Sequence, residues 1–219
     1  MNNVQLSEHI RANYPLTSRS IKLKKAAYGE FVNDADYIVS PRINGKQRRC
    51  PAYEKWISMV LRCNHQSCLK RRPTYSDSII CDEWKSFMSF RAWWIENQVD
   101  GWQLDKDLLV PGNKTYSPAT CVFVPLWLNT FLCDRKSKRG ELPIGVCFSE
   151  KRRSFSAHCR DPIRKKGVMI GRYKTIDEAR DAYVSTKIMH AESLKCEIDK
   201  IDSRLFDSIK KIIESRRYY

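Results

Sequence analysis

Seven consecutive residues, Ser154–Arg160, alternate strictly between polar and apolar side chains. Successive side chains of a β-strand point to opposite faces, so the pattern predicts a strand with Phe155, Ala157 and Cys159 on a buried face. The polar face exposed to water would then carry Ser154, Ser156, His158 and Arg160. A strand with one apolar face needs neighbouring strands and a second layer to cover that face.

The residues around this strand predict both. Apolar runs indicate flanking strands at 144–148 and 168–173. The segment Thr175–Glu178 has the sequence of a capping box, in which two side chains satisfy the first backbone N–H groups of a helix. Ala179 and Ala182 would let that helix pack closely on a sheet. The carboxyl-terminal part is therefore predicted to be a three-stranded antiparallel sheet packed on one helix.

Upstream, aromatic and apolar residues recur at helical spacing in 53–63 and again in 84–94, with Asp82 as the expected cap of the second helix. Such aromatic stripes form cores, so we assign them no chemistry.

The residues after this second helix predict strands as well as a helix. Segments 102–105 and 121–124 are expected strands, separated by the turn-forming loop 110–118, and Pro125 suits the first position of a helix. The predicted order is strand, loop, strand, helix.

The fold class expected from these patterns is α+β, with five segments along the chain. They are a basic N-terminal arm or thin cap (1–48), an HNH-like ββα domain with a helical lead-in (49–133), a charged linker (134–142), a sheet-and-helix domain (143–191) and a C-terminal amphipathic helix (192–219). The arm is expected to be either a solvated terminus or a segment that binds along the phosphate backbone of a nucleic acid. The last helix is expected to pack on the protein's own sheet, with a homodimer contact as the alternative.

The net charge of the chain limits the kinds of molecule that it is expected to bind. The chain of 219 residues has 40 Lys and Arg against 25 Asp and Glu, a net charge of +15 that attracts polyanions, of which nucleic acid is the obvious one. No stretch approaches the roughly 20 apolar residues of a membrane-spanning helix, and the N-terminus lacks a signal-peptide core. We therefore expect a cytoplasmic protein without a membrane partner.

The cysteines also fit a cytoplasmic protein. There are nine, an odd number, mostly in apolar surroundings, which favours reduced thiols over a disulfide framework. Cys63 and Cys68 have the closest spacing to a zinc site, but no second pair follows, and we expect no structural zinc.

A cationic outer face on a small sheet can enter the DNA major groove, where arginine reads guanine edges and basic turns hold phosphates. The alternative is that these charges only keep an exposed sheet soluble.

Four short motifs, at 144–146, 160–162, 170–173 and 177–183, resemble the plant ethylene-response-factor (ERF) type DNA-binding domain, which also occurs in phage and mobile-element nucleases. The resemblance covers about 143–191. It implies that the outer sheet face lies in the major groove of double-stranded DNA. The DNA-binding residues expected there are Arg152, Arg153, His158, Arg160, Lys165 and Lys166. Cys147 and Met169 stand where the plant domains have arginine and tryptophan, so the resemblance implies no particular target sequence.

The segments 104–107, 112–125 and 128–129, with their lead-in from Tyr53, resemble phage HNH endonucleases of the ββα-metal fold. This resemblance implies metal-dependent hydrolysis or nicking of duplex DNA, with Mg²⁺ or Mn²⁺ as cofactor. Asp105 and Asn129 would hold the metal.

The catalytic residues implied are Asp105, Lys106, Asp107 and Asn129. Lys106 stands at the family's general-base histidine and Thr120 at its middle asparagine. A lysine beside two aspartates is protonated at neutral pH and suits neutralising them better than accepting a proton. Asp107, or a water activated by Asp105, would then act as the base. Otherwise the site is degenerate, or the three residues form a surface ion-pair cluster without a metal.

The sequence thus predicts a DNA-binding, HNH-like endonuclease of a phage or mobile element, acting in a bacterial cell. The alternative is a catalytically degenerate relative that acts as a DNA-binding repressor or interference factor. A third possibility is a protein-binding antagonist of a nucleic-acid enzyme.

Overall fold

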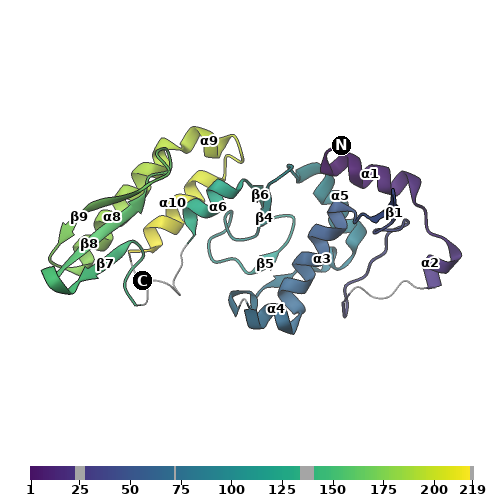
Figure 1. Cartoon of the computed structure of the whole chain (residues 1–219), viewed down its shortest axis with the longest axis horizontal. Coiled ribbons are helices and arrows are strands. Elements are labelled where there is room, and N and C mark those ends of the chain that lie inside the picture. The colour runs from purple at the N-terminus through teal and green to yellow at the C-terminus, as the bar shows by residue number, and fades with distance from the viewer. Residues whose placement is uncertain (23–27, 72, 134–140, 218–219) are drawn as a thin grey trace. The chain divides into compact units, whose positions relative to one another are not determined.

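The computed structural model describes residues 1–22, 28–71, 73–133 and 141–217 (Figure 1). The chain divides into two compact units, which are described separately. The first comprises Met1–Asp107 and Gly112–Phe123, and the second Leu108–Pro111 and Val124–Tyr219. Residues 134–140, most of the expected linker, lie outside the described residues.

The core of the first unit is aromatic. Helices α3 (Pro51–Asn64) and α5 (Phe87–Asn97) pack on each other, and their helical spacing places Trp56, Phe90 and Trp94 on the faces that meet. The Trp56 indole Nε1 donates to the backbone oxygen of Trp84 at 2.8 Å, so that this buried polar group is satisfied.

The prediction that Asp82 caps the second helix is wrong. Asp82–Lys85 forms a short 3-10 helix, η2, and Ser86 caps α5 by accepting a hydrogen bond from the Ser89 backbone N–H at 3.1 Å. Asp34 holds the cap, because its carboxylate accepts from the Ser86 hydroxyl at 2.6 Å and from the Met88 N–H at 2.9 Å. A remote carboxylate therefore outweighed the local cap signal.

The segment 1–48 was expected as an arm or thin cap, but several of its described parts pack on this core. Helix α1 (Asn3–Asn13) lies against α3, and Ile10, Phe31 and Tyr37 are buried in the same cluster. The remaining short elements of this part are α2 (Ser18–Lys22), β1 (Arg42–Ile43) and β2 (Lys46–Gln47).

Four short strands complete the first unit, and the last of them ends at Val124, where the second unit resumes. They are β3 (Ile79–Ile80), β4 (Gln103–Asp105), β5 (Thr115–Tyr116) and β6 (Val122–Val124), in which β3 pairs with β5 and β4 pairs with β6. Helix α4 (Gln66–Arg71) and the 3-10 helix η1 (Pro73–Tyr75) connect α3 to β3. The two strands predicted between residues 102 and 124 are therefore present, but the segment 110–118, predicted as a loop, contains the additional strand β5, which pairs with β3.

The second unit contains the predicted three-stranded antiparallel sheet packed on a helix, which confirms the α+β fold class. Its strands are β7 (Val146–Ser149), β8 (Ser154–Arg160) and β9 (Gly167–Tyr173), with β8 in the centre; helix α8 (Ile176–Ser193) covers one face (Figure 1). The capping box at Thr175 and Glu178 is present, as predicted.

Gly145 allows α8 to approach the sheet. A Cβ atom there would lie 2.2 Å from the Tyr183 ring, and the residue has φ +79°. Both the backbone conformation and the close contact therefore require glycine.

The C-terminal segment forms two helices rather than the single one predicted. They are α9 (Lys195–Asp199) and α10 (Leu205–Ser215), and α10 packs on α8 with Leu205, Ile209 and Ile213 buried. The apolar face of α10 is thus covered within its own chain.

Helix α6 (Leu126–Leu132) belongs to the second unit, not with the strands that precede it in sequence. Arg216 donates to the Leu132 carbonyl at 2.5 Å and to the Tyr183 hydroxyl at 3.3 Å. The Lys187 ammonium lies 3.6 Å from the centre of the Phe131 ring. These contacts hold α6 against α8 and α10.

Among the helices in the described ranges, none combines the length and apolar content needed to cross a membrane.

Candidate functional site

The outer face of the sheet in the second unit is the first candidate site. Along β8 the predicted alternation is present: Ala157 and Cys159 are buried beneath α8, whereas His158 and Arg160 are exposed on the opposite face. Phe155, expected on the buried face, is half-buried and packs on Phe148, with ring centres 4.9 Å apart. The strand therefore separates core from surface as its sequence predicts.

The register of the strands defines rows across this outer face. Ser156 of β8 lies opposite Cys147 on one side and opposite Arg172 on the other. The Ser156 hydroxyl lies 3.1 Å from His158 Nε2 and donates to the Cys147 carbonyl at 3.4 Å. Outward side chains from all three strands thus lie on one surface, where Cys147 and Met169 are exposed beside the polar residues.

The sequence analysis did not identify Arg172 as a member of this surface. A β-bulge between Ala157 and His158 shifts the register of β9, so that Arg172 faces outward beside Ser156 and Met169 beside His158. Alternation around Gly171 and Tyr173 was the available signal for Arg172.

Basic turns lie at both ends of the strands. Arg152 ends the 3-10 helix η3 (Glu150–Arg152), and Arg153 follows it in a left-handed conformation, φ 46°. Both are exposed.

Lys165 and Lys166 occupy the turn between β8 and β9, and both are exposed. The Asp161 carboxylate orders that turn by accepting the backbone N–H groups of Ile163 and Arg164, each at 2.9 Å. These N–H donors lower the pKa of Asp161. The carboxylate is thereby committed to the backbone of the turn.

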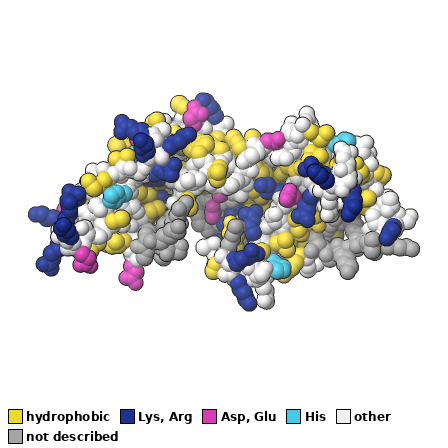
Figure 2. Space-filling view, in the orientation of Figure 1, with side chains coloured by type: hydrophobic (Ala, Val, Ile, Leu, Met, Phe, Trp, Pro, Cys, Tyr) yellow, Lys and Arg dark blue, Asp and Glu magenta, His cyan; other side chains and the backbone are white. Residues whose placement is uncertain are grey.

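The charge of this unit is segregated. The strands and turns from 144 to 174 have nine Lys and Arg against two carboxylates, whereas the helices from 175 to 217 have nine of each. Figure 2 shows dark-blue Lys and Arg side chains gathered at the end of the unit where Figure 1 labels β7, β8 and β9.

Local ion pairs do not cancel this excess. Within the described residues, no carboxylate lies within salt-bridge distance of Arg152, Arg153, Arg160 or Lys166. In contrast, the helical cations Lys195, Lys200 and Arg204 are each paired with an acidic neighbour. The sheet side therefore has unneutralised positive charge.

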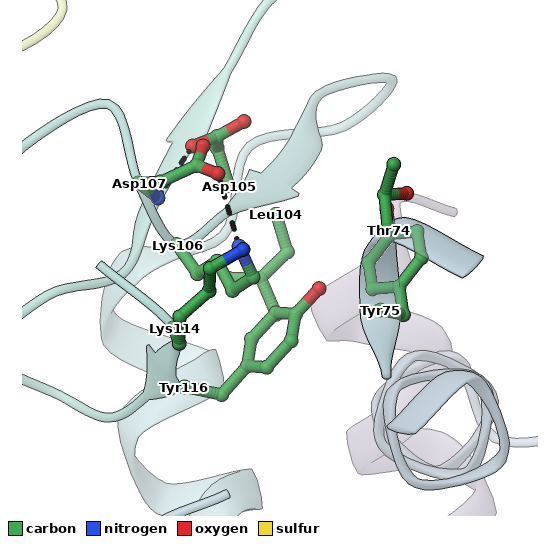
Figure 3. A pocket seen from close by; sticks show the side chains of 8 residues that line it. All are labelled: Thr74, Tyr75, Leu104, Asp105, Lys106, Asp107, Lys114 and Tyr116. Atoms are coloured by element: carbon green, nitrogen blue, oxygen red, sulfur yellow. Dashed lines mark hydrogen bonds and ion pairs between the residues drawn. The ribbon is translucent and has the colours of Figure 1, made fainter. Parts of the chain in front are cut away.

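A pocket in the first unit is the second candidate site (Figure 3). The residues that line it come from η1, from β4 and the loop after it, and from β5 and the residue before it. They are Thr74, Tyr75, Leu104, Asp105, Lys106, Asp107, Lys114 and Tyr116. It thus contains three of the four predicted catalytic residues.

Lys106 is held firmly inside this pocket. Only 7% of the residue is exposed, and its ammonium lies 2.9 Å from the Asp107 carboxylate and 3.3 Å from the Asn113 carbonyl. The Asp107 backbone N–H donates to the Asp105 carboxylate at 2.9 Å. The Lys106 ammonium is thus paired with one carboxylate, that of Asp107, while the other carboxylate, that of Asp105, accepts a backbone N–H.

The loop after these residues is tied down by side chains. The Asn113 amide donates to the carbonyls of Lys106 at 2.6 Å and Thr115 at 2.7 Å. The Thr120 hydroxyl also donates to the Thr115 carbonyl, at 2.7 Å. Thr120, which stands at the asparagine position of the HNH resemblance, therefore stabilises the loop.

Asn129 lies on α6 in the second unit, whereas Asp105 lies in the first. The metal pair Asp105 and Asn129 stays a prediction. No group of three or more His, Cys, Asp or Glu side chains that could hold a metal occurs in the parts of the chain that the structure describes. An Asp105 site would thus need amide, backbone or water oxygens as well, which Mg²⁺ accepts.

Compared with known proteins, the chain matches no family model, no curated protein and no solved structure.

Proposed function

We propose that this protein binds duplex DNA through the outer face of β7, β8 and β9, in the cytoplasm of a bacterial cell. The observation that carries the proposal is the charge segregation of the second unit. Nine Lys and Arg against two carboxylates stand on its strands and turns, while the helices behind them are balanced. Charges that only keep a surface soluble can be of either sign and can lie on any side of the protein. Binding to a polyanion, in contrast, requires positive charge on the surface that faces it.

The dimensions of the sheet suit the major groove. Outward side chains on one strand recur about every 6.6 Å, close to two base-pair steps of about 3.4 Å. Three strands span about 10 Å between the outer backbones, against a groove width of about 12 Å. His158, Arg160 and Arg172 would then face base edges.

The basic turns would hold the backbone on either side. Arg152 and Arg153 at one end, and Lys165 and Lys166 at the other, are exposed cations that can contact phosphates. Such contacts set orientation and affinity, and the side chains on the strands would provide any sequence preference.

The experiment is a salt titration of DNA binding by fluorescence anisotropy. The full-length variant R152Q/R153Q/R160Q/K166Q removes four positive charges from the sheet side. Three of these cations, Arg152, Arg153 and Lys166, would contact phosphates. Each lost phosphate contact reduces the magnitude of the slope of log affinity against log salt by about 0.9, so a reduction of about 3 is expected.

The matched control is K195Q/K200Q/R204Q/K210Q, which removes the same charge from helical cations that are ion-paired. It is expected to keep nearly the wild-type slope. Equal slopes for both variants would mean that only net charge matters, and the proposed surface would be wrong.

A second candidate function, metal-dependent phosphodiester hydrolysis, is favoured by the pocket of the first unit. Asp105 and Asp107 lie together at the end of β4, and Lys106 and Lys114 line the same pocket. Carboxylate oxygens suit Mg²⁺ or Mn²⁺, and a nearby ammonium can stabilise a developing oxyanion. Because Lys106 is paired with Asp107, it would act as an electrostatic group and not as the base.

Supercoiled plasmid incubated with Mg²⁺ or Mn²⁺ tests this function. Asp105→Ala is expected to reduce nicking at least about a hundredfold, because the loss of a group that only supports a metal ligand already costs about 10- to 100-fold. Asp77→Asn, an exposed carboxylate that accepts a bond from Ser76 outside the pocket, is the control and should nick normally. DNA retention without nicking in either metal would leave the binding function and reject hydrolysis.

A further inference from the structure

A short hairpin in the first unit carries a second concentration of positive charge. It consists of β1 and β2 with Asn44 and Gly45 at the tip, where φ is 51° and 74°. Two consecutive residues with positive φ give the turn whose twist matches that of paired strands. Arg42 lies opposite Gln47, and Ile43 opposite Lys46.

The hairpin continues below these strands into the core. The Arg48 backbone N–H donates to the Pro41 carbonyl and the Cys50 N–H to the Val39 carbonyl, both at 2.8 Å. Cys50 is fully buried, and its sulfur lies 3.2 Å from the Ser7 hydroxyl and 3.3 Å from the Tyr37 hydroxyl. The ribbon is therefore anchored at its base and ordered to its tip.

Its charged side chains are exposed and have no acidic neighbours. Arg42, Lys46, Arg48 and Arg49 are all exposed, and no Asp or Glu occurs between Tyr37 and Tyr53. Where the structure describes the chain, none of these four cations forms an ion pair. In the same unit, Arg11 and Lys85 pair with carboxylates.

The pairing of β1 with β2 also indicates on which face of the hairpin each charged side chain lies. Because Arg42 lies opposite Gln47 and side chains alternate along a strand, Arg42 and Arg49 share one face as diagonal neighbours, which lie about 7–8 Å apart. Ile43, on the other face, packs against the core. The first face thus presents two guanidinium groups to solvent. Lys46 and Arg48 alternate onto the face of Ile43 but are also exposed, so that cations lie on both sides of the hairpin.

We propose that this hairpin is a second DNA contact, which binds the phosphate backbone of the duplex held by the sheet. The inference rests on the DNA-binding function proposed above for the identity of its ligand. Guanidinium groups pair well with phosphates, and contacts to phosphates need no particular base sequence. The expected phosphate-following arm is in this view an ordered ribbon.

Two contacts on one chain also explain how a small sheet could hold DNA firmly. Once one unit is bound, the covalent connection raises the effective concentration of the other near the duplex. Loss of either contact is expected to weaken binding more than its own affinity would indicate.

The test is the full-length variant R42Q/K46Q/R48Q/R49Q, measured on a duplex of about 30 base pairs from about 50 to 300 mM salt. The salt slope is expected to fall by about 2 to 4, at about 0.9 per phosphate contact, with at least a tenfold loss of affinity at low salt. Affinity and slope equal to those of K195Q/K200Q/R204Q/K210Q would overturn the proposal. An unchanged melting temperature shows that the fold is intact.

A cross-linking measurement separates this proposal from the sheet proposal. A photo-reactive amino acid at Gln47 is expected to cross-link to DNA in the otherwise wild-type protein and also when the four sheet-side cations are replaced. Cross-linking at Gln47 with no effect of the sheet substitutions would support the hairpin and reject the sheet. No cross-link at Gln47, with a strong effect of the sheet substitutions, would reject the hairpin only.

Discussion

Lys187 is a lysine in an apolar setting, and its removal should change how stability depends on pH. It lies on α8 and is only 4% exposed. Burial lowers its pKa from 10.5 to about 8; Cys159, on the face of β8 that α8 covers, opposes this shift, and the positive charge of Arg216 adds to it. The nearby His190 also has a pKa lowered by burial.

The direction in which stability changes with pH follows from the number of protons that the folded and unfolded chains bind. Below pH 8 the lysine is charged in both the folded and the unfolded chain, and the full cost of burying it is present. Between pH 8 and 10.5 the unfolded chain binds more protons, so the folded state becomes relatively more stable as pH rises. A lowering of about 2.5 pKa units corresponds to about 3 kcal/mol.

Part of this cost is already offset. The ammonium lies 3.6 Å from the centre of the Phe131 ring, and a desolvated cation–π contact stabilises by about 2 kcal/mol. Lys187→Met removes both the buried charge and this contact while keeping a similar shape. At pH 7 it is therefore expected to stabilise the second unit by about 1 kcal/mol.

Urea unfolding of wild type and Lys187→Met at pH 7 and pH 10 measures the effect. The free energy of unfolding of the wild type, relative to the variant, should rise by about 1 to 3 kcal/mol across this interval, with the lower figure expected for a cation–π contact of full strength, because only the ammonium makes that contact. Comparison with the variant cancels the other groups that titrate there. A difference that stays constant with pH would refute the desolvation argument, and so would a strong destabilisation by methionine at pH 7.

Three further substitutions test the packing. Gly145→Ala should destabilise the second unit by more than about 2 kcal/mol, because its Cβ would clash with Tyr183 in a left-handed conformation; a wild-type melting temperature would contradict this. Thr175→Ala should cost about 1 kcal/mol in urea unfolding by removing the α8 cap, while serine there should cost little, and equal losses would argue against capping. Trp56→Phe leaves the Trp84 carbonyl without its donor and should cost about 1–3 kcal/mol, which a neutral result would disprove.

Local patterns accounted for much of the fold. The alternation in Ser154–Arg160 and the capping box at Thr175 each depend on neighbours in sequence, and both are present as predicted. The aromatic spacing around Trp56 and Trp94 likewise predicted the core of the first unit. These signals work because a helix or strand exposes its period directly in the sequence.

Other features needed contacts between distant residues. Asp34 moved the start of α5 away from Asp82, over more than fifty residues of intervening chain. The pairing of β8 with β9 placed Arg172 beside Ser156, and the core anchored the basic hairpin through Cys50. None of these follows from local periodicity, because each depends on which segments pack together.

The candidate sites likewise have features that the sequence determines and features that depend on tertiary structure. The sequence by itself determined the charge, the basic turns and the grouping of Asp105, Lys106 and Asp107. Only the tertiary structure decided that Lys106 is buried against Asp107, and that Asn129 lies on a helix of the second unit. Burial and ion pairing depend on the three-dimensional surroundings of a side chain, and these surroundings are built from residues far apart in the chain.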